Sequence, residues 1–220
     1  MSTERSAEHD AEQADHPDPP AGATVESAST PGSRPLPPRR VWLLALAALL
    51  VLALDVITKV LVAATLEVDQ QAGAAPPKLL GGLVYLSVLR NPGAAWGLAS
   101  GMTLVLAVVG LAVVGFIIWM APRLRSVGWA LGLGLILGGA MGNLSDRLFR
   151  APAPLQGHVV DFISVFSPYG HTFPVFNVAD SGLTVGCLLI VLMALLQRDY
   201  DGTSARDRRT GDASEGGATA

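Results

Sequence analysis

The chain has 220 residues, of which 50% are hydrophobic and only 15% are charged. Because a soluble domain averages about 25% charged residues, so apolar a chain is not expected to be a water-soluble globule, and a cytosolic enzyme is excluded. The single cysteine, Cys187, excludes an internal disulfide framework and a cysteine-rich metal site, and the net charge of −3 argues against a nucleic-acid partner.

Both ends of the chain are polar. Residues 1–40 hold seven acidic residues, four basic residues and seven of the fifteen prolines, and residues 197–220 hold five acidic and four basic residues. Segments of this composition cannot bury enough apolar surface to offset the entropy lost on ordering. We therefore predict that residues 1–40 and 198–220 are disordered tails, and that residues 41–197 form the functional domain.

Four long apolar segments lie between the tails, at about residues 41–64, 96–120, 127–144 and 177–196. At about 1.5 Å per residue, the first segment is about 36 Å long as a helix, which suffices to cross a bilayer with some tilt. It follows a long polar tail and exceeds the apolar core of a signal peptide, so a cleaved leader is a poor interpretation. The sequence thus predicts an all-α membrane protein with four transmembrane helices.

The third apolar segment is rich in glycine. Gly134, Gly138 and Gly142 recur every four residues and share one helix face. Glycines on one face let neighbouring backbones approach closely. We therefore predict that this helix packs at the centre of the bundle.

Two of the connections between these segments have structure of their own. Residues 81–89 (GGLVYLSVL) are rich in β-formers and predict a small strand or hairpin. Residues 145–176 contain four prolines, and within them residues 159–166 fit either a strand or a surface helix. We expect both connections to form a small structure on one face of the membrane.

Basic residues are distributed unevenly along the chain. If the amino terminus is cytoplasmic, the segments on that side carry ten arginines, whereas the opposite loops carry four basic residues. Cytoplasmic segments of membrane proteins carry the excess of Lys and Arg. We predict that both termini are cytoplasmic and that the two structured connections are extracytoplasmic.

The polar residues of the core gather at the extracytoplasmic end. Asp55 and Lys59 lie four residues apart on one helix face and can form an ion pair. Burying an ionisable group at the bilayer centre costs at least about 2.5–3.5 kcal/mol, so such groups are by default paired and functional. An ion pair that only ties helices together remains an equal alternative for this pair alone. Nine such positions at one end predict a functional site: Asp55, Lys59, Asn91, Asn143, Asp146, Arg147, Asp161, Asn177 and Asp180.

The residue types at this end favour carboxylate chemistry. Cys187 has no histidine near it in sequence, the chain lacks H-E-x-x-H and G-x-S-x-G motifs, and Lys59 beside Asp55 is better suited to staying charged than to acting as a base. Asp161 and Asp180 both lie in apolar surroundings. Two carboxylates a few ångströms apart share one proton, so that one acts as base and the other as acid. Such a pair can activate a water for attack on an amide.

Five sequence blocks resemble, in order and spacing, those of the lipoprotein signal peptidase (signal peptidase II) family. The resemblance covers about residues 41–197, and one departure is Trp96, where the family more often has phenylalanine. The blocks are Asp55-Val-Ile-Thr-Lys59, Asn91-Pro-Gly-Ala-Ala-Trp-Gly97, Gly138-Gly-Ala-Met-Gly-Asn-Leu-Ser-Asp-Arg147, Val160-Asp-Phe162 and Phe176-Asn-Val-Ala-Asp180.

The resemblance implies a bacterial inner-membrane aspartic protease that cleaves diacylglyceryl-modified prolipoproteins on the amino side of the lipidated cysteine. It implies Asp161 and Asp180 as the catalytic dyad, no metal or other cofactor, a small extracytoplasmic β-structure with a surface helix, contact with membrane lipid, and inhibition by globomycin-type cyclic peptides. The residues that match motif positions around the dyad, and are expected to bind the substrate or orient the site, are Asp55, Lys59, Asn91, Asn143, Arg147 and Asn177. Those expected to be structural near the site are Gly93, Gly139, Gly142 and Asp146.

Two other classes of function fit parts of the pattern. A small ion- or proton-coupled transporter would use Asp55, Lys59 and Asp180 as a relay. Transporters usually show internal repeats and midplane sites, whereas this sequence shows no repeat and its polar cluster lies off the midplane. A non-catalytic scaffold would require that the nine polar positions have no role.

Overall fold

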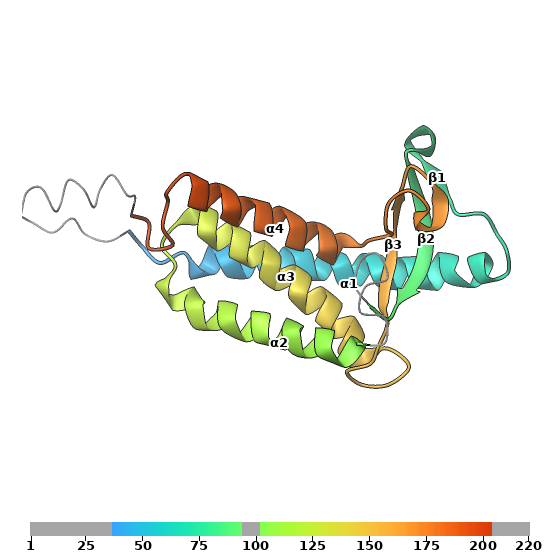
Figure 1. Cartoon of the computed structure of the whole chain (residues 1–220), viewed down its shortest axis with the longest axis horizontal. Coiled ribbons are helices and arrows are strands. Elements are labelled where there is room, and N and C mark those ends of the chain that lie inside the picture. Colours follow the sequence, from blue (N-terminus) through green and yellow to red (C-terminus); the bar gives the residue numbers. More distant parts are fainter. Residues whose placement is uncertain (1–36, 94–101, 204–220) are drawn as a thin grey trace, which may run out of the picture. The chain divides into compact units, whose positions relative to one another are not determined.

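The computed structural model describes residues 37–93 and 102–203. The helices in this part are α1 (Val41–Gln71), α2 (Thr103–Met120), α3 (Val127–Phe149) and α4 (Val178–Leu195), with single 3₁₀ turns at Leu80–Gly82, Ala121–Arg123 and Pro168–Gly170. The four long helices lie side by side (Figure 1), and each is long and apolar enough to cross a membrane. The prediction of four membrane spans is confirmed. The predicted tails, the start of the second span and Trp96 fall largely or wholly outside the described residues.

Two helices extend beyond their predicted ends. α1 continues from residue 64 to Gln71, because the Gln70 side chain pairs with a strand: its Nε2 donates to Leu86 O (2.7 Å) and its Oε1 accepts from Val88 N (3.0 Å). α3 continues from Leu144 to Phe149. In both places the helix extends past the end of the apolar segment, so a prediction from hydropathy alone ended the helix too early.

α3 packs between α1 and α4, as predicted from its glycines. A Cβ added at Gly138 would lie 2.5 Å from Ala48 O of α1, and one added at Gly139 would collide with Ala179 O of α4. The absence of side chains at these two positions lets both neighbouring backbones approach. Within its apolar segment α3 is 56% buried, compared with 17–28% for the other three helices.

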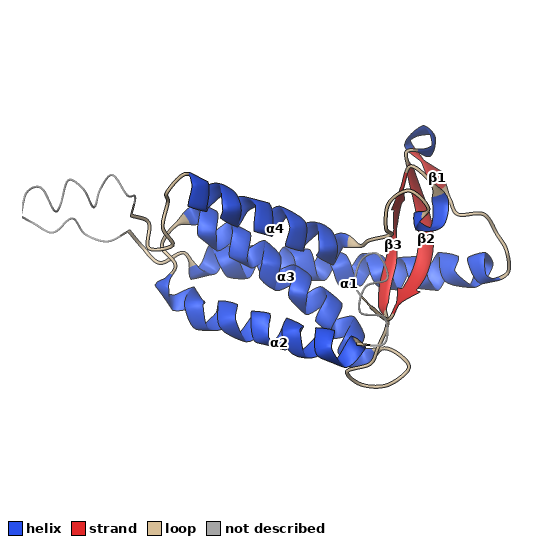
Figure 2. Ribbon diagram, viewed as in Figure 1, coloured by secondary structure: helices blue, strands red, loops and turns tan. Residues whose placement is uncertain are grey.

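A three-stranded antiparallel sheet lies where α3 ends and α4 begins, which we call the polar end of the bundle (Figure 2). Its strands are β1 (Lys78–Leu79), β2 (Val84–Asn91) and β3 (Val159–Val165), in the order β1-β2-β3. Residues 159–165 therefore form a strand, as their β-branched content favours. Beside the sheet the described part has only the 3₁₀ turns Leu80–Gly82 and Pro168–Gly170, and the expected surface helix is not among its elements. The register pairs Leu89 with Asp161.

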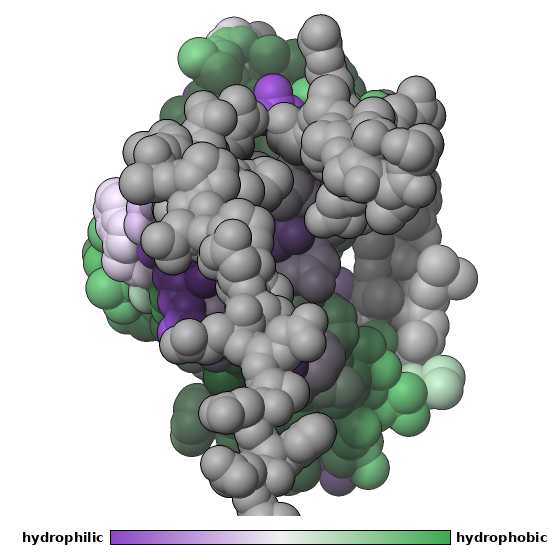
Figure 3. All heavy atoms as spheres, turned by 90° about the vertical axis from the view of Figure 1, so that its left-hand side faces the viewer, coloured by the Kyte–Doolittle hydropathy of each residue, from purple (hydrophilic) through white to green (hydrophobic). Residues whose placement is uncertain are grey.

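The outer surfaces of the helices are apolar. Large side chains point away from the bundle, among them Leu49 (63% exposed), Val108 (55%) and Leu188 (64%). Figure 3, which views the molecule from the opposite end, shows hydrophobic residues around its rim. This distribution fits contact with lipid rather than with water.

Candidate active site

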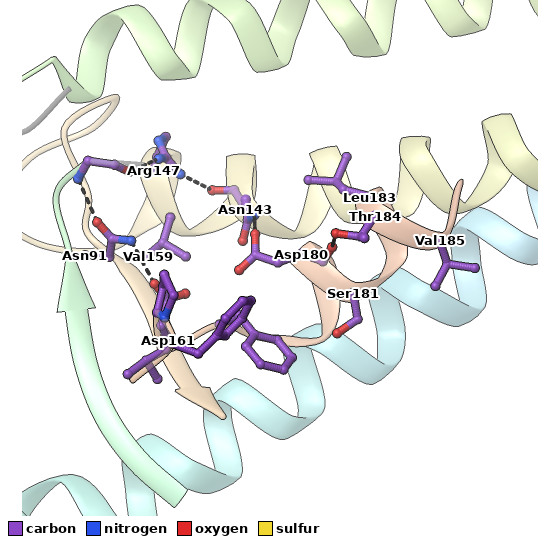
Figure 4. A pocket seen from close by; sticks show the side chains of 15 residues that line it. Asn91, Asn143, Arg147, Val159, Asp161, Asp180, Ser181, Leu183, Thr184 and Val185 are labelled. Atoms are coloured by element: carbon purple, nitrogen blue, oxygen red, sulfur yellow. Dashed lines mark hydrogen bonds between the residues drawn. The ribbon is translucent and has the colours of Figure 1, made fainter. Parts of the chain in front are cut away.

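A cavity of about 550 Å³ opens at the polar end between α3, α4 and β3 (Figure 4). Six of the residues singled out in the sequence line it, and one of its walls is mainly apolar. These six are Asn91, Gly93, Asn143, Arg147, Asp161 and Asp180, and the other lining residues are Val159, Phe173, Pro174, Val175, Phe176, Ser181, Leu183, Thr184 and Val185.

Asp161 lies in the middle of β3 and is 3% exposed. Its Oδ2 accepts a hydrogen bond from Asn91 Nδ2 (2.8 Å), and its Oδ1 accepts one from Asn177 Nδ2 (2.7 Å). The pairing of β2 with β3 delivers Asn91 to this carboxyl group. Burial, and next the nearby charge of Asp180, raise the pKa of Asp161 to about 7, although its two amide hydrogen bonds oppose the shift.

Asp180 is fixed by the start of α4. Asn177 is the N-cap: its Oδ1 accepts from Asp180 N (2.9 Å), and its own backbone N donates to Asp180 Oδ2 (3.2 Å), which completes a capping box. Asn143 Nδ2 of α3 donates to Asp180 Oδ1 (2.7 Å). The Asn177-Val-Ala-Asp180 block therefore both starts α4 and holds the Asp180 carboxyl group in place.

The two carboxyl groups face one pocket but are joined through an amide. Among the described residues no hydrogen bond links Asp161 directly to Asp180; Asn177, which is completely buried, contacts both. In Figure 4 the two side chains approach the same space, one from the strand and the other from the helix. The arrangement holds two carboxyl groups toward whatever occupies the cavity.

Arg147 brings a positive charge to the rim of the same pocket. It is 8% exposed, and its Nη2 donates to Gly93 O (2.9 Å). Gly93 is held in turn by Asn91, whose Oδ1 accepts from Gly93 N (2.9 Å). The Nε of Arg147 is buried and has no hydrogen-bond partner within residues 37–93 and 102–203.

Behind the pocket lies a second group of charges that do not line it. Lys59 Nζ contacts Asp55 Oδ2 (2.7 Å) and Asp146 Oδ2 (3.0 Å), which confirms the predicted pairing of Asp55 with Lys59. Asp146 also forms an ion pair with Arg150 and accepts from Val160 N (3.1 Å), next to Asp161. All three core residues of this group are at most 3% exposed. Asp55, Lys59 and Asp146 therefore support the site from behind.

Two predicted structural glycines make room for this support. A Cβ at Gly142 would lie 2.5 Å from Asp55 Oδ2 and 3.1 Å from the Ala179 side chain. A Cβ at Gly139 would strike the backbone of α4 where that helix begins. The glycines of α3 therefore set the position of α4, which carries Asp180.

The comparisons with known proteins agree on one family. Residues 47–196 match the family model described as "Signal peptidase (SPase) II". The lipoprotein signal peptidase of Mycobacterium tuberculosis (strain H37Rv) is 45% identical over 197 residues, which cover 86% of this chain and 93% of that protein, and the one of Rhodococcus jostii is 46% identical, covering 89% and 90%.

A solved structure described as a bacterial membrane enzyme aligns with a TM-score of 0.59 at 27% identity, covering 73% of this chain and 92% of its own. This chain belongs to the signal peptidase II family. As a member of that family it is a protease and a multi-pass membrane protein, as predicted, and the transporter interpretation is not favoured.

Part of the pocket of this signal peptidase II was missed in the sequence. The apolar wall comes from residues 173–175, from Phe176 at the start of the last sequence block, and from α4 beyond Asp180, including Leu183 and Val185. The aromatic run Phe173-Pro-Val-Phe176 directly before Asn177 was the available signal. Because this run lies in a proline-rich loop and shows no hydrophobic periodicity, the sequence did not predict that it lines the pocket.

Other reactive groups lie away from the pocket. Within residues 37–93 and 102–203, no three His, Cys, Asp or Glu side chains come together as a metal site, and neither His158 nor His171, both in the connection from α3 to α4, lines the pocket. Cys187 is exposed on the surface of α4, in the apolar segment that faces lipid.

Proposed function

We propose that this signal peptidase II removes signal peptides from diacylglyceryl-modified prolipoproteins by cleaving the peptide bond on the amino side of the lipidated cysteine, with Asp161 and Asp180 as its catalytic dyad. One observation carries the assignment: two carboxyl groups on separate elements, β3 and α4, line one pocket and are bridged by the buried Asn177. No other carboxyl group among the described residues lines that pocket.

The chemistry needs one ionised and one protonated carboxyl group. The ionised one takes a proton from a water molecule, which attacks the scissile carbonyl carbon, and the protonated one gives its proton to the leaving nitrogen. Because the pKa of Asp161 is raised to about 7, this residue can hold or release a proton near neutral pH. The two carboxyl groups and the water supply acid, base and nucleophile, so the reaction proceeds without a covalent intermediate or a cofactor.

Arg147 is suited to the oxygen of the scissile bond. Arg147 lines the same pocket as the dyad, and its Nε–H has no hydrogen-bond partner among the described residues. Negative charge develops on the carbonyl oxygen as water attacks, and a fixed donor there lowers the barrier. Asn91, Asn143 and Asn177 act one step further back by holding the two carboxyl groups.

The pocket fits an amphiphilic substrate in a membrane. From Asp180 its lining continues along α4 through Leu183 to Val185, toward the apolar part of the bundle (Figure 4). A signal sequence and acyl chains could lie against this wall in the bilayer while the scissile bond reaches the dyad. We place this site at the extracytoplasmic face of the bacterial inner membrane, with both termini cytoplasmic. The described residues Arg39, Arg40, Arg123, Arg125 and Arg198 lie at the opposite ends of the helices, and cytoplasmic segments carry the excess of basic residues. Globomycin-type cyclic peptides are expected to compete for the same pocket.

The test is processing of a diacylglyceryl-modified prolipoprotein by the full chain purified in detergent, where no ion gradient exists. We expect release of the intact signal peptide and a mature product that begins with the lipidated cysteine, both detected by mass spectrometry. The same precursor without the lipid should be cleaved far more slowly. Full processing by either Asp161→Asn or Asp180→Asn would refute the dyad, and a requirement for an ion gradient would instead support the transporter interpretation.

A further inference from the structure

Lys59 is completely buried, yet it touches neither the pocket nor either catalytic carboxyl group. Its Nζ has three partners: Asp55 Oδ2 at 2.7 Å, Asp146 Oδ2 at 3.0 Å and Asn143 Oδ1 at 3.0 Å. An ammonium group has three N–H donors and no acceptor. Two of these donors face the carboxylates of Asp55 and Asp146, and the third donates to the amide oxygen of Asn143, which lines the pocket.

This third contact fixes which way round the Asn143 amide lies. Because the ammonium group can only donate, the Asn143 amide must turn its Oδ1 toward Lys59 Nζ. Its Nδ2 group then points at Asp180 Oδ1 (2.7 Å) and donates to it. The reversed amide would set NH₂ against the ammonium and a carbonyl oxygen against the carboxylate. Both hydrogen bonds would be lost together.

The orientation of the Asn143 amide also determines how the Asn177 amide lies. Asn143 Oδ1, already held by Lys59, also accepts from Asn177 Nδ2 (3.2 Å). With its Nδ2 on that side, Asn177 also donates to Asp161 Oδ1 (2.7 Å), and its Oδ1 remains for the backbone N of Asp180 (2.9 Å). One buried cation is thus connected to both members of the dyad through two amides.

We propose that Lys59 is a positioning residue, which sets the orientation of the Asn143 and Asn177 amides so that Asp161 and Asp180 both meet N–H donors. This inference rests on the proposed dyad and adds a role to Lys59 that an ion pair between helices would not require. The competing explanation is that Lys59 only ties α1 to α3 through Asp55 and Asp146.

The two explanations differ in a double-mutant cycle on kcat. We expect Lys59→Met to lower kcat by about a hundredfold, the loss typical of a small misplacement of reacting groups. Because Lys59 does not line the pocket, KM should change by no more than about twofold. If Lys59 acts through Asn143, adding Lys59→Met to Asn143→Ala should lower kcat little further; independent effects would multiply and would overturn the proposal.

A packing variant serves as the matched control. Gly134→Ala places a Cβ 2.7 Å from Leu44 O and 2.8 Å from the Ala47 side chain, so it loosens the contact between α1 and α3 far from the amides. We expect it to lower the thermal midpoint but to keep kcat within about threefold of wild type, since no reacting group moves. If Lys59→Met loses no more kcat than Gly134→Ala at a matched loss of thermal stability, Lys59 is only a tie between helices and the proposal is wrong.

If Lys59→Met does not fold, both partners of the Lys59–Asp55 ion pair can be replaced together. In Lys59→Met/Asp55→Asn no charge loses its only partner, because Asp146 keeps Arg150 and the backbone of Val160. This double variant is combined with Asn143→Ala in the same way as Lys59→Met. Little further loss of kcat would support the positioning role, and multiplied losses would overturn it. Full activity of Asp161→Asn would instead remove the dyad itself, so a failure of the proposed function is distinguishable from a failure of the positioning role.

Discussion

Two layers of charge lie at the polar end of the bundle, and they are organised differently. In the buried layer, formed by Asp55, Lys59 and Asp146, both carboxylates contact the ammonium within 3.0 Å. In the pocket layer, no cation of the described residues lies within ion-pair distance of Asp161 or Asp180, although Arg147 lines the same pocket. Asparagine amides and a backbone N–H hold these two carboxyl groups. Carboxylates in direct ion pairs within a filled space stabilise a fold, whereas a carboxyl group beside a cavity and without a direct ion pair is open to contact with a substrate.

The largest effect is expected in the pocket layer. Asp180→Asn keeps the size of the side chain but removes a proton-transfer group, so kcat should fall by about 10⁴-fold. Because the amide can still cap the start of α4, the thermal midpoint in detergent should change little. Steady-state cleavage of a lipidated precursor, measured together with thermal unfolding, checks both parts. Substantial residual cleavage would show that a carboxyl group at this position is dispensable and would break the distinction between the layers.

The pH dependence of stability tests whether the pocket layer is uncompensated. An aspartate in an unfolded chain has its pKa near 3.8, whereas Asp161 in the folded protein has its pKa near 7. The native state therefore binds a proton that the unfolded state has released, and stability falls as the pH rises from about 4 to about 7. At about 1.4 kcal/mol for each pH unit between the two values, the loss approaches about 4 kcal/mol.

The measurement for this prediction is the thermal midpoint at pH 5 and at pH 8. Wild type should lose more stability between these values than Asp161→Asn, whose amide does not titrate. Equal losses in the two proteins would mean that Asp161 is ionised at neutral pH. The pocket layer would then carry compensated charges, as the buried layer does.

The sequence predicted the parts of this comparison that depend on local spacing. Apolar length gave the four helices, and the separation of four residues gave the pairing of Asp55 with Lys59. Which predicted residues face the pocket depends on how α1 and α3 are rotated about their axes. That rotation is set by backbone contacts such as Gly138 against Ala48, which hydropathy and spacing do not specify.

The connections between the helices were predicted less completely for a related reason. Residues 159–165 become a strand because they pair with β2, more than sixty positions earlier in the chain. The hydrogen bond from Val160 N to Asp146 likewise joins an element to a helix end through the fold. Pairings of this kind are tertiary, so the local pattern left both a strand and a surface helix open.

A smaller effect is expected from crowding the buried layer. The added Cβ of Gly142→Ala would press on the Asp55 carboxylate, which cannot move away while Lys59 holds it. Overpacking of this kind costs about 1–3 kcal/mol, so the thermal midpoint should fall. Gly115→Ala on α2 is the matched control, because its Cβ would meet nothing within 4 Å. If both variants unfold at the same temperature, the buried layer is less tightly packed than the comparison requires.

The smallest effect is expected from a third set of charges at the same end. Arg90 donates to both carboxylate oxygens of Glu67 (2.7 and 2.6 Å), and the side chains are 36% and 15% exposed. Ion pairs near solvent contribute about 0–1 kcal/mol, so Glu67→Gln should barely change the thermal midpoint and should leave kcat unchanged. A large loss of activity would mean that any charge near this end affects catalysis. Near-wild-type activity would tie the chemistry to the two carboxyl groups that open onto the cavity.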